Sequence, residues 1–533
     1  MPQANPTGSN HYDAVIIGGG HNGLVTAAYL AGNGRRVVVL EARELVGGCA
    51  VTEEIWPGYK ISTASYLLSL MQQKVVDDLD LPRFGYAVDA KDPAFFSPYP
   101  DGRYILTWQD EAQTQSEIAR FSKKDAETYP KYNAHLERLG MVAESLLLTT
   151  PPDFPPSSIG DFIEYLKLAG KMRGLSRVEI VGLVKIFTQS VADFLDDWFE
   201  SDELKVMLAT DGVIGANGGP RSPGTAYILL HHTMGGVDGH RGLWGFVRGG
   251  MGTVSEAIAA SAKARGTEIR TNARVERILT KDGRSAGVVL EGGEEFHAPI
   301  VASNLDPKLT FLHLLAPSEL PEEFRSGIEK FRCEGTSLKM NFALSGTPEF
   351  KVLPEAGPHL GATMHICPSV DYIERAWDDA KYGRPSHSPA IEMTMPTMYD
   401  KSLAPEGHHI MGIFMQYAPY TLKDTTWDEL CEPYTERVLD VIEEYVPNIR
   451  RILVHRQTLT PLDLERRFGI TGGNIFHGEM SLDQMFVMRP LAGWARYRTP
   501  VKGLYLCGSG GHPGGGVMGA PGHNCAREIL KDT

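Results

Sequence analysis

The feature that most constrains this chain is a glycine-rich segment between two short apolar runs near the N-terminus. Residues 14–17 (AVII) precede GGGHNG at residues 18–23, and apolar residues then recur at helical spacing over residues 24–31. A second apolar run at residues 37–40 (VVVL) ends in Glu41. Strand, glycine turn, helix, strand and terminal acid follow the order of a βαβ unit that binds a dinucleotide. The sequence therefore predicts a Rossmann-type domain.

The three glycines of the G-x-G-x-x-G pattern have different physical roles. Gly18 allows a tight turn, Gly20 lets the backbone approach a pyrophosphate, and Gly23 lets the helix pack against the strand. The N-terminus of the helix then faces the phosphates. Glu41 comes 18 positions after Gly23, where its carboxylate would accept hydrogen bonds from the adenosine ribose.

The residues after Glu41 distinguish a flavin from a nicotinamide dinucleotide. A second glycine pair follows within VGGCA at residues 46–50, as in flavoproteins, where this pair brings backbone near the flavin. We therefore expect FAD as the cofactor. The contacts expected from this segment, besides Gly18, Gly20, Gly23 and Glu41, are Ala42, Arg43, Gly48, Cys49 and Ala50.

A hairpin is expected to close the nucleotide-binding domain. Residues 268–279 and 285–290 are strand-like and are joined through Asp282 and Gly283, which favour a tight turn. We expect Val275 in this hairpin to contact the adenine through its backbone.

Two further segments are expected to complete the cofactor site. An apolar run at residues 299–304 follows the hairpin, and residues 504–508 predict a strand near the C-terminus. The glycines at residues 514–519 precede the last helix, whose N-terminal N–H groups would stabilise an anionic reduced ring. The contacts expected from these segments are Asn304, Gly508, Ser509, Gly516, Val517 and Met518.

The cofactor motifs lie in three separate stretches, so the FAD-binding domain is expected to be discontinuous. We place it at residues 1–80, 240–320 and 490–533. The intervening residues 81–239 and 321–489 would form a substrate domain of mixed α+β structure, with strands at 338–344 and 409–416 and a helix at 434–445. The predicted fold class is α/β, with a Rossmann-type domain and this second domain.

Composition excludes several classes of function. The 533 residues carry 52 Lys and Arg against 66 Asp and Glu, a formal net charge of −14, so a nucleic-acid partner is not expected. The six cysteines form no C-x-x-C pair, which argues against a redox dithiol and against a structural metal site. We expect no metal.

The sequence also bears on location. Residues 1–10 have neither a signal-peptide nor a transit-peptide pattern and are expected to be a loose tail, and no apolar run reaches the length of a membrane span. We expect a cytoplasmic protein. An amphipathic helix at residues 178–199 is either a core face or an interfacial helix beside a tunnel mouth, which leaves peripheral membrane contact open. Nothing in the sequence indicates an oligomeric state.

Taken together, the motifs resemble the phytoene desaturase-like branch of the flavin amine oxidase superfamily. The segments at residues 18–24 and 504–519 are typical of the whole superfamily. Other segments are similar to a subgroup called pyridine nucleotide-disulfide oxidoreductase domain-containing proteins. These are GGCAVTEE (47–54), ASYLLSL (64–70), LLHHTMGG (229–236), RGGMG with its glycines at 249–252, and GGNIFHGEMSLDQ (472–484). Superfamily members usually carry Arg where this chain has Cys49.

The resemblance implies an FAD-dependent oxidoreductase with the flavin between two domains. Its implied substrates are lipophilic and isoprenoid- or carotenoid-like, with hydride passing between an apolar carbon and flavin N5 in a desaturase or saturase reaction. A flavin amine oxidase and a binding protein of the GDP-dissociation-inhibitor type share the fold and remain alternatives. Disulfide reduction is rejected because the chain has no dithiol motif.

The candidate catalytic residues lie in the segment at residues 472–484. His477 and Glu479 are our candidates for the proton acceptor, because either group could act as a base in an apolar cleft. His231 and His232 have three open roles, which are structural support, cavity lining and metal binding. The residues expected to make the substrate cavity apolar are Tyr66, Leu67, Leu68, Trp244 and Phe476.

Overall fold

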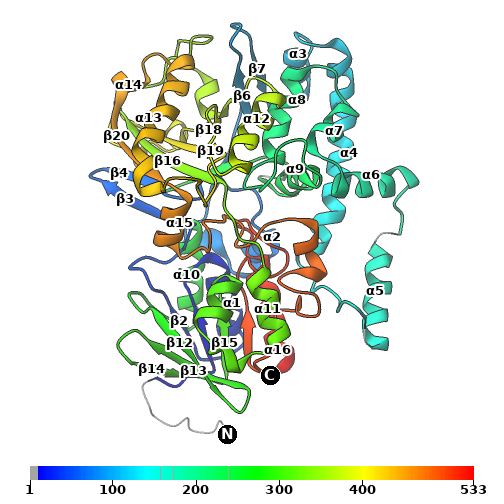
Figure 1. The fold of residues 1–533 in the computed structure, drawn as a ribbon, viewed down its shortest axis with the longest axis vertical. Helices are drawn as coiled ribbons and strands as arrows, with labels where there is room; N and C mark the ends of the chain where they lie inside the picture. Colours follow the sequence, from blue (N-terminus) through cyan, green and yellow to red (C-terminus); the bar gives the residue numbers. More distant parts are fainter. Residues whose placement is uncertain (1–9, 157, 172, 238) are drawn as a thin grey trace.

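A computed structural model describes residues 10–156, 158–171, 173–237 and 239–533, so the predicted loose tail lies almost wholly outside the described residues. Figure 1 shows two parts, one below around a parallel sheet and one above around a larger sheet. We call them the parallel-sheet part and the mixed-sheet part. The chain passes between them several times.

The parallel-sheet part is built on five strands that are all parallel to their neighbours. Apolar residues fill the three inner strands on both faces, as a sheet covered on both sides requires. The strand order is β11 (Glu268–Arg270), β2 (Val37–Leu40), β1 (Ala14–Ile17), β15 (Ile300–Ser303) and β21 (Leu504–Leu506). The Rossmann-type α/β architecture is therefore confirmed.

Each face of this sheet has its own cover. One face packs against α1 (His21–Gly32), α10 (Gly252–Ala264) and α16 (Ala520–Asp532). The other packs against the antiparallel sheet β12 (Val275–Lys281), β13 (Arg284–Leu290) and β14 (Glu295–His297), and against α11 (Glu322–Lys330). The predicted hairpin corresponds to β12 and β13, whereas Glu268–Arg270 pairs with β2 instead.

The mixed-sheet part has seven strands, and α13 (Trp427–Tyr445) packs on one face. Its strands are antiparallel except for the pair β17 and β6. The order is β20 (Leu453–Leu459), β16 (Ser337–Leu344), β19 (His409–Gln416), β18 (Ala390–Thr394), β17 (Thr363–Ile366), β6 (Phe95–Pro98) and β7 (Tyr104–Thr107).

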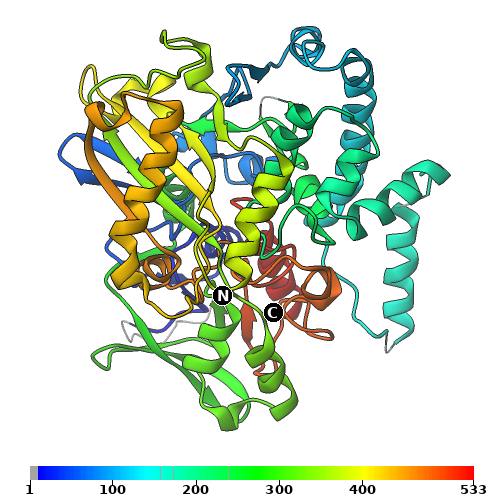
Figure 2. The same cartoon turned by 45° about the horizontal axis from the view of Figure 1, so that its top comes forward.

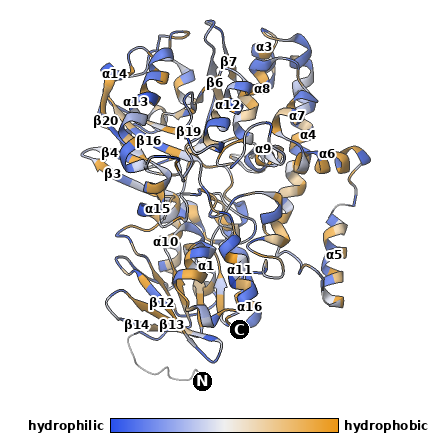
Figure 3. Ribbon diagram, in the orientation of Figure 1, coloured by the Kyte–Doolittle hydropathy of each residue, from blue (hydrophilic) through white to orange (hydrophobic). Residues whose placement is uncertain are grey.

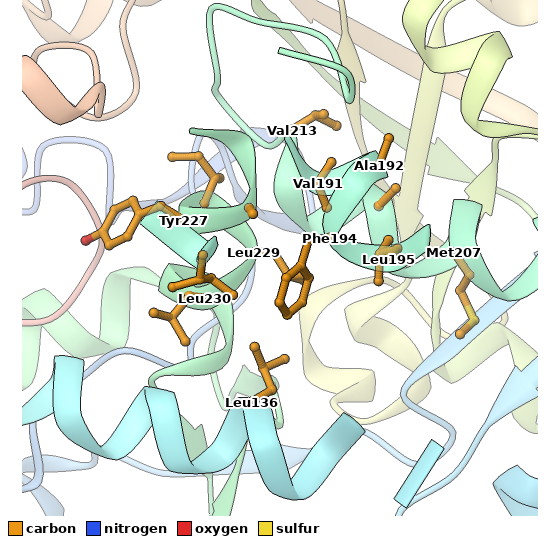
Figure 4. Close-up of a cluster of buried hydrophobic side chains, with 14 of the residues drawn as sticks. Leu136, Val191, Ala192, Phe194, Leu195, Met207, Val213, Tyr227, Leu229 and Leu230 are labelled. Atoms are coloured by element: carbon orange, nitrogen blue, oxygen red, sulfur yellow. The ribbon is translucent and has the colours of Figure 1, made fainter. Parts of the chain in front are cut away.

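A helical layer lies beside this sheet. Leu136, Phe194 and Leu230 converge in its core, from α4 (Lys123–Leu147), α7 (Val191–Asp196) and α9 (Thr225–Thr233) (Figure 4). The other elements are α2 (Gln73–Asp78), α3 (Glu111–Ile118), α8 (Asp202–Ala209), α12 (Val370–Lys381), α14 (Ile449–Ile452), α15 (Pro461–Phe468), β3 (Thr52–Trp56), β4 (Tyr59–Ser62), β5 (Val88–Ala90), β8 (Gly236–Val237), β9 (His240–Arg241) and β10 (Gly245–Val247).

The single helix expected at residues 178–199 is wrong. It is two helices, α6 (Arg177–Thr188) and α7, because the Ser190 side chain accepts a hydrogen bond from the Asp193 backbone N–H and starts a new helix. Leu183 is buried, but Val184 is exposed, so the apolar positions do not form one core face.

Helices α5 (Ile159–Lys171) and α6 project from the body as an arm, which Figures 1 and 2 show from two directions. Apolar side chains of both helices face solvent, among them Ile159 at 82% exposure, Leu166 at 71% and Val178 at 70%. The same helices carry much of the apolar colouring on that side of Figure 3. Among the described residues, no helix is long and apolar enough to cross a membrane.

Candidate active site

A cavity of about 580 Å³ runs from the carboxyl ends of the parallel strands into the mixed-sheet part. Its wall at one end includes Gly18, Glu41 and Val275, and at the other Lys91, Lys339 and Glu392. We call these the nucleotide end and the polar end. Ligands of open α/β sheets bind outside the carboxyl ends of the strands, so this cavity is the candidate site.

Glycines shape the nucleotide end by the absence of side chains. A Cβ atom on Gly20 would lie 2.5 Å from Asn304 Nδ2, and one on Gly23 would lie 2.4 Å from the Gly18 carbonyl oxygen. Gly20 therefore keeps the cavity wall open at the start of α1, whereas Gly23 lets α1 pack on the turn and does not line the cavity.

Glu41 is fixed at the end of β2 by two backbone donors. Gly19 N–H donates to its Oε2 at 2.7 Å and Arg43 N–H donates to its Oε1 at 2.8 Å. The side chain is buried, yet it lines the cavity. Its remaining lone pairs suit the ribose hydroxyls that the sequence pattern predicted.

Most of the predicted cofactor residues line this one cavity. They are Gly18, Gly20, Glu41, Ala42, Arg43, Gly48, Cys49, Ala50, Val275, Asn304, Ser509, Gly516 and Val517. Gly23, Gly508 and Met518 do not line it, and their contacts with the cofactor stay predictions. A Cβ on Gly508 would lie 2.5 Å from the Asn304 carbonyl oxygen, and Met518 is buried in the helical core.

Cys49 lies in the cavity wall where the resembling proteins carry Arg. Burial raises the pKa of its thiol to about 12, so the thiol stays protonated at neutral pH. A protonated thiol is a poor nucleophile, and Cys49 acts as a small wall residue.

His477 lies in the cavity wall. Its Nδ1 has no hydrogen-bond partner in the described protein, and neither does Nε2 of His21, another wall residue. Buried polar atoms require partners, so an additional polar group from a cofactor or substrate fits here. Burial, with Arg489 as a second cause, lowers the pKa of His477 to about 4 and keeps the imidazole neutral.

The expectation for Glu479 is corrected. Its side chain does not line the cavity but pairs with Arg332 at 3.0 Å and accepts a hydrogen bond from Asn217 at 3.1 Å. Arg332 also pairs with Asp483 at 2.8 Å. Glu479 therefore belongs to a surface ion-pair network, and we withdraw it as a proton acceptor.

Arg489 is a residue that the sequence analysis missed. It is fully buried and donates hydrogen bonds to five backbone carbonyls, of Phe476, Gly478, Glu479, Gln484 and Ser509. These bonds hold the His477 segment against the C-terminal glycine segment. An arginine before a proline carries no local signal for such a role.

The polar end adds charged groups that the expectation of an apolar cavity did not include. Tyr66, Leu67, Leu68, Trp244 and Phe476 do line the wall. Four ionisable side chains line it beside them, and they come from four separate elements. Lys91 follows β5, Asp211 lies in a 3-10 helix (Thr210–Gly212), Lys339 lies in β16 and Glu392 in β18. Because no two are near in sequence, no motif could reveal them.

Internal partners satisfy part of this cluster. The Tyr66 hydroxyl donates a hydrogen bond to Glu392 at 2.7 Å, and His365 Nε2 lies 3.3 Å from the same carboxylate. Burial alone would raise the pKa of Glu392, but His365, Tyr66 and the charge of Lys91 together outweigh it and lower the pKa. Lys339 Nζ donates to the Met340 carbonyl at 3.0 Å and to Asn341 Oδ1 at 2.9 Å.

Desolvation is the main cause of the pKa shifts of the two lysines. Burial lowers the pKa of Lys91 to about 8 and that of Lys339 to about 7, although nearby carboxylates oppose the shift. Burial raises the pKa of Asp211, while His232 and Lys91 oppose that shift. The polar end thus holds charges that act on one another in a low-dielectric wall.

His231 and His232 both lie in the cavity wall. His232 Nδ1 lies 2.8 Å from the Ile228 carbonyl and its ring stacks on Trp244. Across the described residues, no three His, Cys, Asp or Glu side chains form a group that could hold a metal.

Comparisons with known proteins agree with this geometry. The sequence matches the family of flavin containing amine oxidoreductases over residues 23–530. The chain belongs to this family. It is 42% identical to the rat (Rattus norvegicus) protein called pyridine nucleotide-disulfide oxidoreductase domain-containing protein 2, over 98% of this chain and 94% of that one.

Two more distant relatives share the architecture. A phytoene desaturase (neurosporene-forming) of Cereibacter sphaeroides is 25% identical over 98% of this chain and 95% of its own. A solved structure of a putrescine oxidase triple mutant superposes with a TM-score of 0.60 at 16% identity, over 98% of this chain and 99% of that one. With the family match, the prediction of an FAD-dependent oxidoreductase is confirmed.

Proposed function

We propose that the protein oxidises or reduces a carbon–carbon bond of a lipophilic substrate, with hydride passing between a substrate carbon and flavin N5. The main support for this proposal is the cavity. Its nucleotide end suits FAD, and its wall continues through Leu67, Leu68 and Phe476. The likeness to a phytoene desaturase supports this reading. Bound FAD supplies the hydride acceptor or donor.

The residues of this chain supply binding, exclusion of water and proton handling. Backbone at Gly18 and Gly20 and the Glu41 carboxylate would hold the pyrophosphate and ribose. Desaturation also releases a proton from the carbon next to the hydride donor. We assign its acceptance to the imidazole of His477, which lies in the cavity wall and is neutral. Lys339 is less suited because Nζ already donates two hydrogen bonds.

The test is anaerobic mixing of the oxidised protein with three classes of compound while the visible flavin band is followed. Isoprenoid lipids should bleach the band, and small amines and amino acids should not. Bleaching by hydrophilic amines alone would overturn the proposal in favour of an amine oxidase. The Asp211 carboxylate is the group in the cavity wall that would then hold the ammonium.

We propose also that the α5–α6 arm contacts a lipid surface. Its exposed apolar residues are Ile159, Phe162, Ile163, Leu166, Val178, Ile180, Val181 and Val184. Residues 159–188 carry five basic and three acidic side chains, against an acidic whole chain, so the arm suits anionic lipid where the rest of the surface does not.

Co-sedimentation with vesicles of phosphatidylcholine and phosphatidylglycerol tests this contact. The wild type should sediment with the vesicles, and the double variant Ile159→Ser, Leu166→Ser should remain in solution with its flavin intact. Equal sedimentation of both proteins would refute the lipid contact.

A further inference from the structure

We propose that the substrate carries a hydroxyl group, which binds at the polar end of the cavity against Lys91 and Asp211. This inference deepens the proposed function and rests on it, because it concerns the head group of the same lipophilic substrate. Within one site, the apolar wall would hold the hydrocarbon body and the polar end would fix its orientation.

Hydrogen-bond accounting points to these two residues. Glu392 accepts from Tyr66 and lies beside His365, and Lys339 donates twice, so both have internal partners. Lys91 Nζ donates to Thr363 Oγ1, which leaves further N–H donors of its ammonium group for a ligand. In the described chain, the Asp211 carboxylate accepts no hydrogen bond. Among the four charged side chains of the polar end, the hydrogen-bonding groups without a protein partner are therefore N–H donors of Lys91 and the carboxylate oxygens of Asp211.

Burial increases the cost of leaving the Lys91 donors without a partner. Lys91 is 1% exposed, so bulk water cannot solvate it freely, whereas Asp211 is partly exposed in the cavity wall. A buried donor without a partner is costly, so a ligand that accepts a hydrogen bond from Lys91 gains affinity. A hydroxyl is the simplest group that accepts from Lys91 and donates to Asp211.

Charge balance selects a neutral head group. The formal charges of the two lysines offset those of Asp211 and Glu392, and they interact, since both carboxylates raise the pKa of Lys91 against the effect of burial. A carboxylate or an ammonium on the substrate would add a further charge to a buried cluster that already contains two lysines and two carboxylates. An alcohol adds none.

The experiment measures binding to the oxidised protein by the perturbation of flavin absorption. The probes share one isoprenoid skeleton and differ in the head group: farnesol, farnesoic acid, farnesylamine and the hydrocarbon farnesene. We expect farnesol to bind about tenfold more tightly than farnesene, and more tightly than the acid or the amine. Equal affinity of alcohol and hydrocarbon, or preference for either ion, would overturn the inference.

Two variants should shift the ligand preference in opposite directions. A purely structural role of these residues would not give that result. Asp211→Asn leaves the cluster with an excess positive charge and should shift the preference to farnesoic acid. Lys91→Met leaves an excess negative charge and should shift it to farnesylamine. Asp483→Asn, a matched change of a carboxylate outside the cavity, should keep the wild-type ranking. Unchanged rankings in both cavity variants would refute the assignment.

The readouts separate this inference from the proposed function. Retained flavin absorption shows that each variant is folded around its cofactor. Binding with the expected ranking but no flavin bleaching by any lipid would refute the proposed reaction alone. Bleaching by lipids without preference for the alcohol would refute the head-group assignment alone.

Discussion

At the nucleotide end of the cavity the expected cofactor contacts come from short sequence motifs, whereas at the polar end the four charged side chains come from four distant elements. Gly18, Gly20 and Glu41 lie within one βαβ unit, and Lys91 and Glu392 lie about 300 residues apart along the chain. The difference teaches that cofactor binding is encoded locally and substrate selection globally. A substitution at the nucleotide end should therefore weaken FAD binding, and one at the polar end should change substrate binding.

The largest effect is expected from Gly20→Val at the nucleotide end. The new side chain would clash with Asn304, whose Nδ2 lies 2.5 Å from the position of the added Cβ, and it would fill the space for the pyrophosphate. The purified variant should be colourless after desalting. Gly170→Ala is the control, because its Cβ meets nothing within 4 Å, and it should stay yellow. A yellow Gly20→Val protein would contradict the assignment of the pyrophosphate site to Gly20.

His477→Ala tests the proposed proton acceptor. Loss of the proton acceptor should slow flavin reduction by substrate roughly 100-fold without loss of FAD. Because the pKa of His477 is about 4, the wild-type imidazole is already deprotonated above about pH 5. The rate should accordingly show no inflection from this group between about pH 5 and 8.

Glu479→Gln is the matched control for that variant, since Glu479 lies in the same segment but outside the cavity. Its rate should equal that of the wild type. A slow Glu479→Gln protein beside a normal His477→Ala protein would reverse the assignment of the proton acceptor.

Glu41→Ala should weaken FAD binding without abolishing it. The change removes the acceptor for two backbone N–H groups and for the ribose, a loss of about 2 kcal/mol or about 30-fold in Kd. Fluorescence titration of the apoprotein with FAD measures the change. An unchanged Kd would show that Glu41 only supports the loop.

Lys339→Met should affect stability rather than the cofactor. A buried ammonium is costly, so Met should raise the free energy of unfolding by about 1–2 kcal/mol at neutral pH, even though Asn341 loses a donor. Below about pH 7 the lysine is charged in both the folded and the unfolded protein, so the full cost applies.

The stability advantage of Lys339→Met should depend on pH. As pH rises from about 7 toward 10.5, the folded protein holds Lys339 neutral and the cost disappears. The advantage of Met, measured by denaturant unfolding with bound FAD, should therefore be largest near about pH 6 and smallest near about pH 10. An advantage that grows with pH would contradict the lowered pKa.

The same contrast explains how far the sequence could predict this molecule. Strands at residues 14–17 and 37–40 and the β12–β13 hairpin follow from local patterns, and the structure has them. The break between α6 and α7 depended on a single cap at Ser190, which the apolar periodicity concealed. Glu479 was misjudged because its partner Arg332 is remote in sequence.

The polar end is the part of the site that the sequence could least predict. Lys339 and Glu392 lie in buried strands with apolar residues on either side of them, so no local sequence pattern links the two. Only the pairing of β16, β19 and β18 brings them to one cavity. A sequence-based prediction of an apolar substrate cavity was therefore incomplete, whereas the prediction of the FAD-dependent oxidoreductase fold was confirmed.

The central claim is that a lipophilic substrate exchanges hydrogen with the flavin across the middle of this cavity. The most direct test is one anaerobic turnover of the oxidised protein with an isoprenoid alcohol, followed by mass spectrometry of the recovered lipid. We predict a product that is lighter by two hydrogen atoms, has a new carbon–carbon double bond and keeps its hydroxyl group, in amounts equal to the flavin reduced. Flavin bleached by an amine while every lipid is recovered unchanged would contradict it.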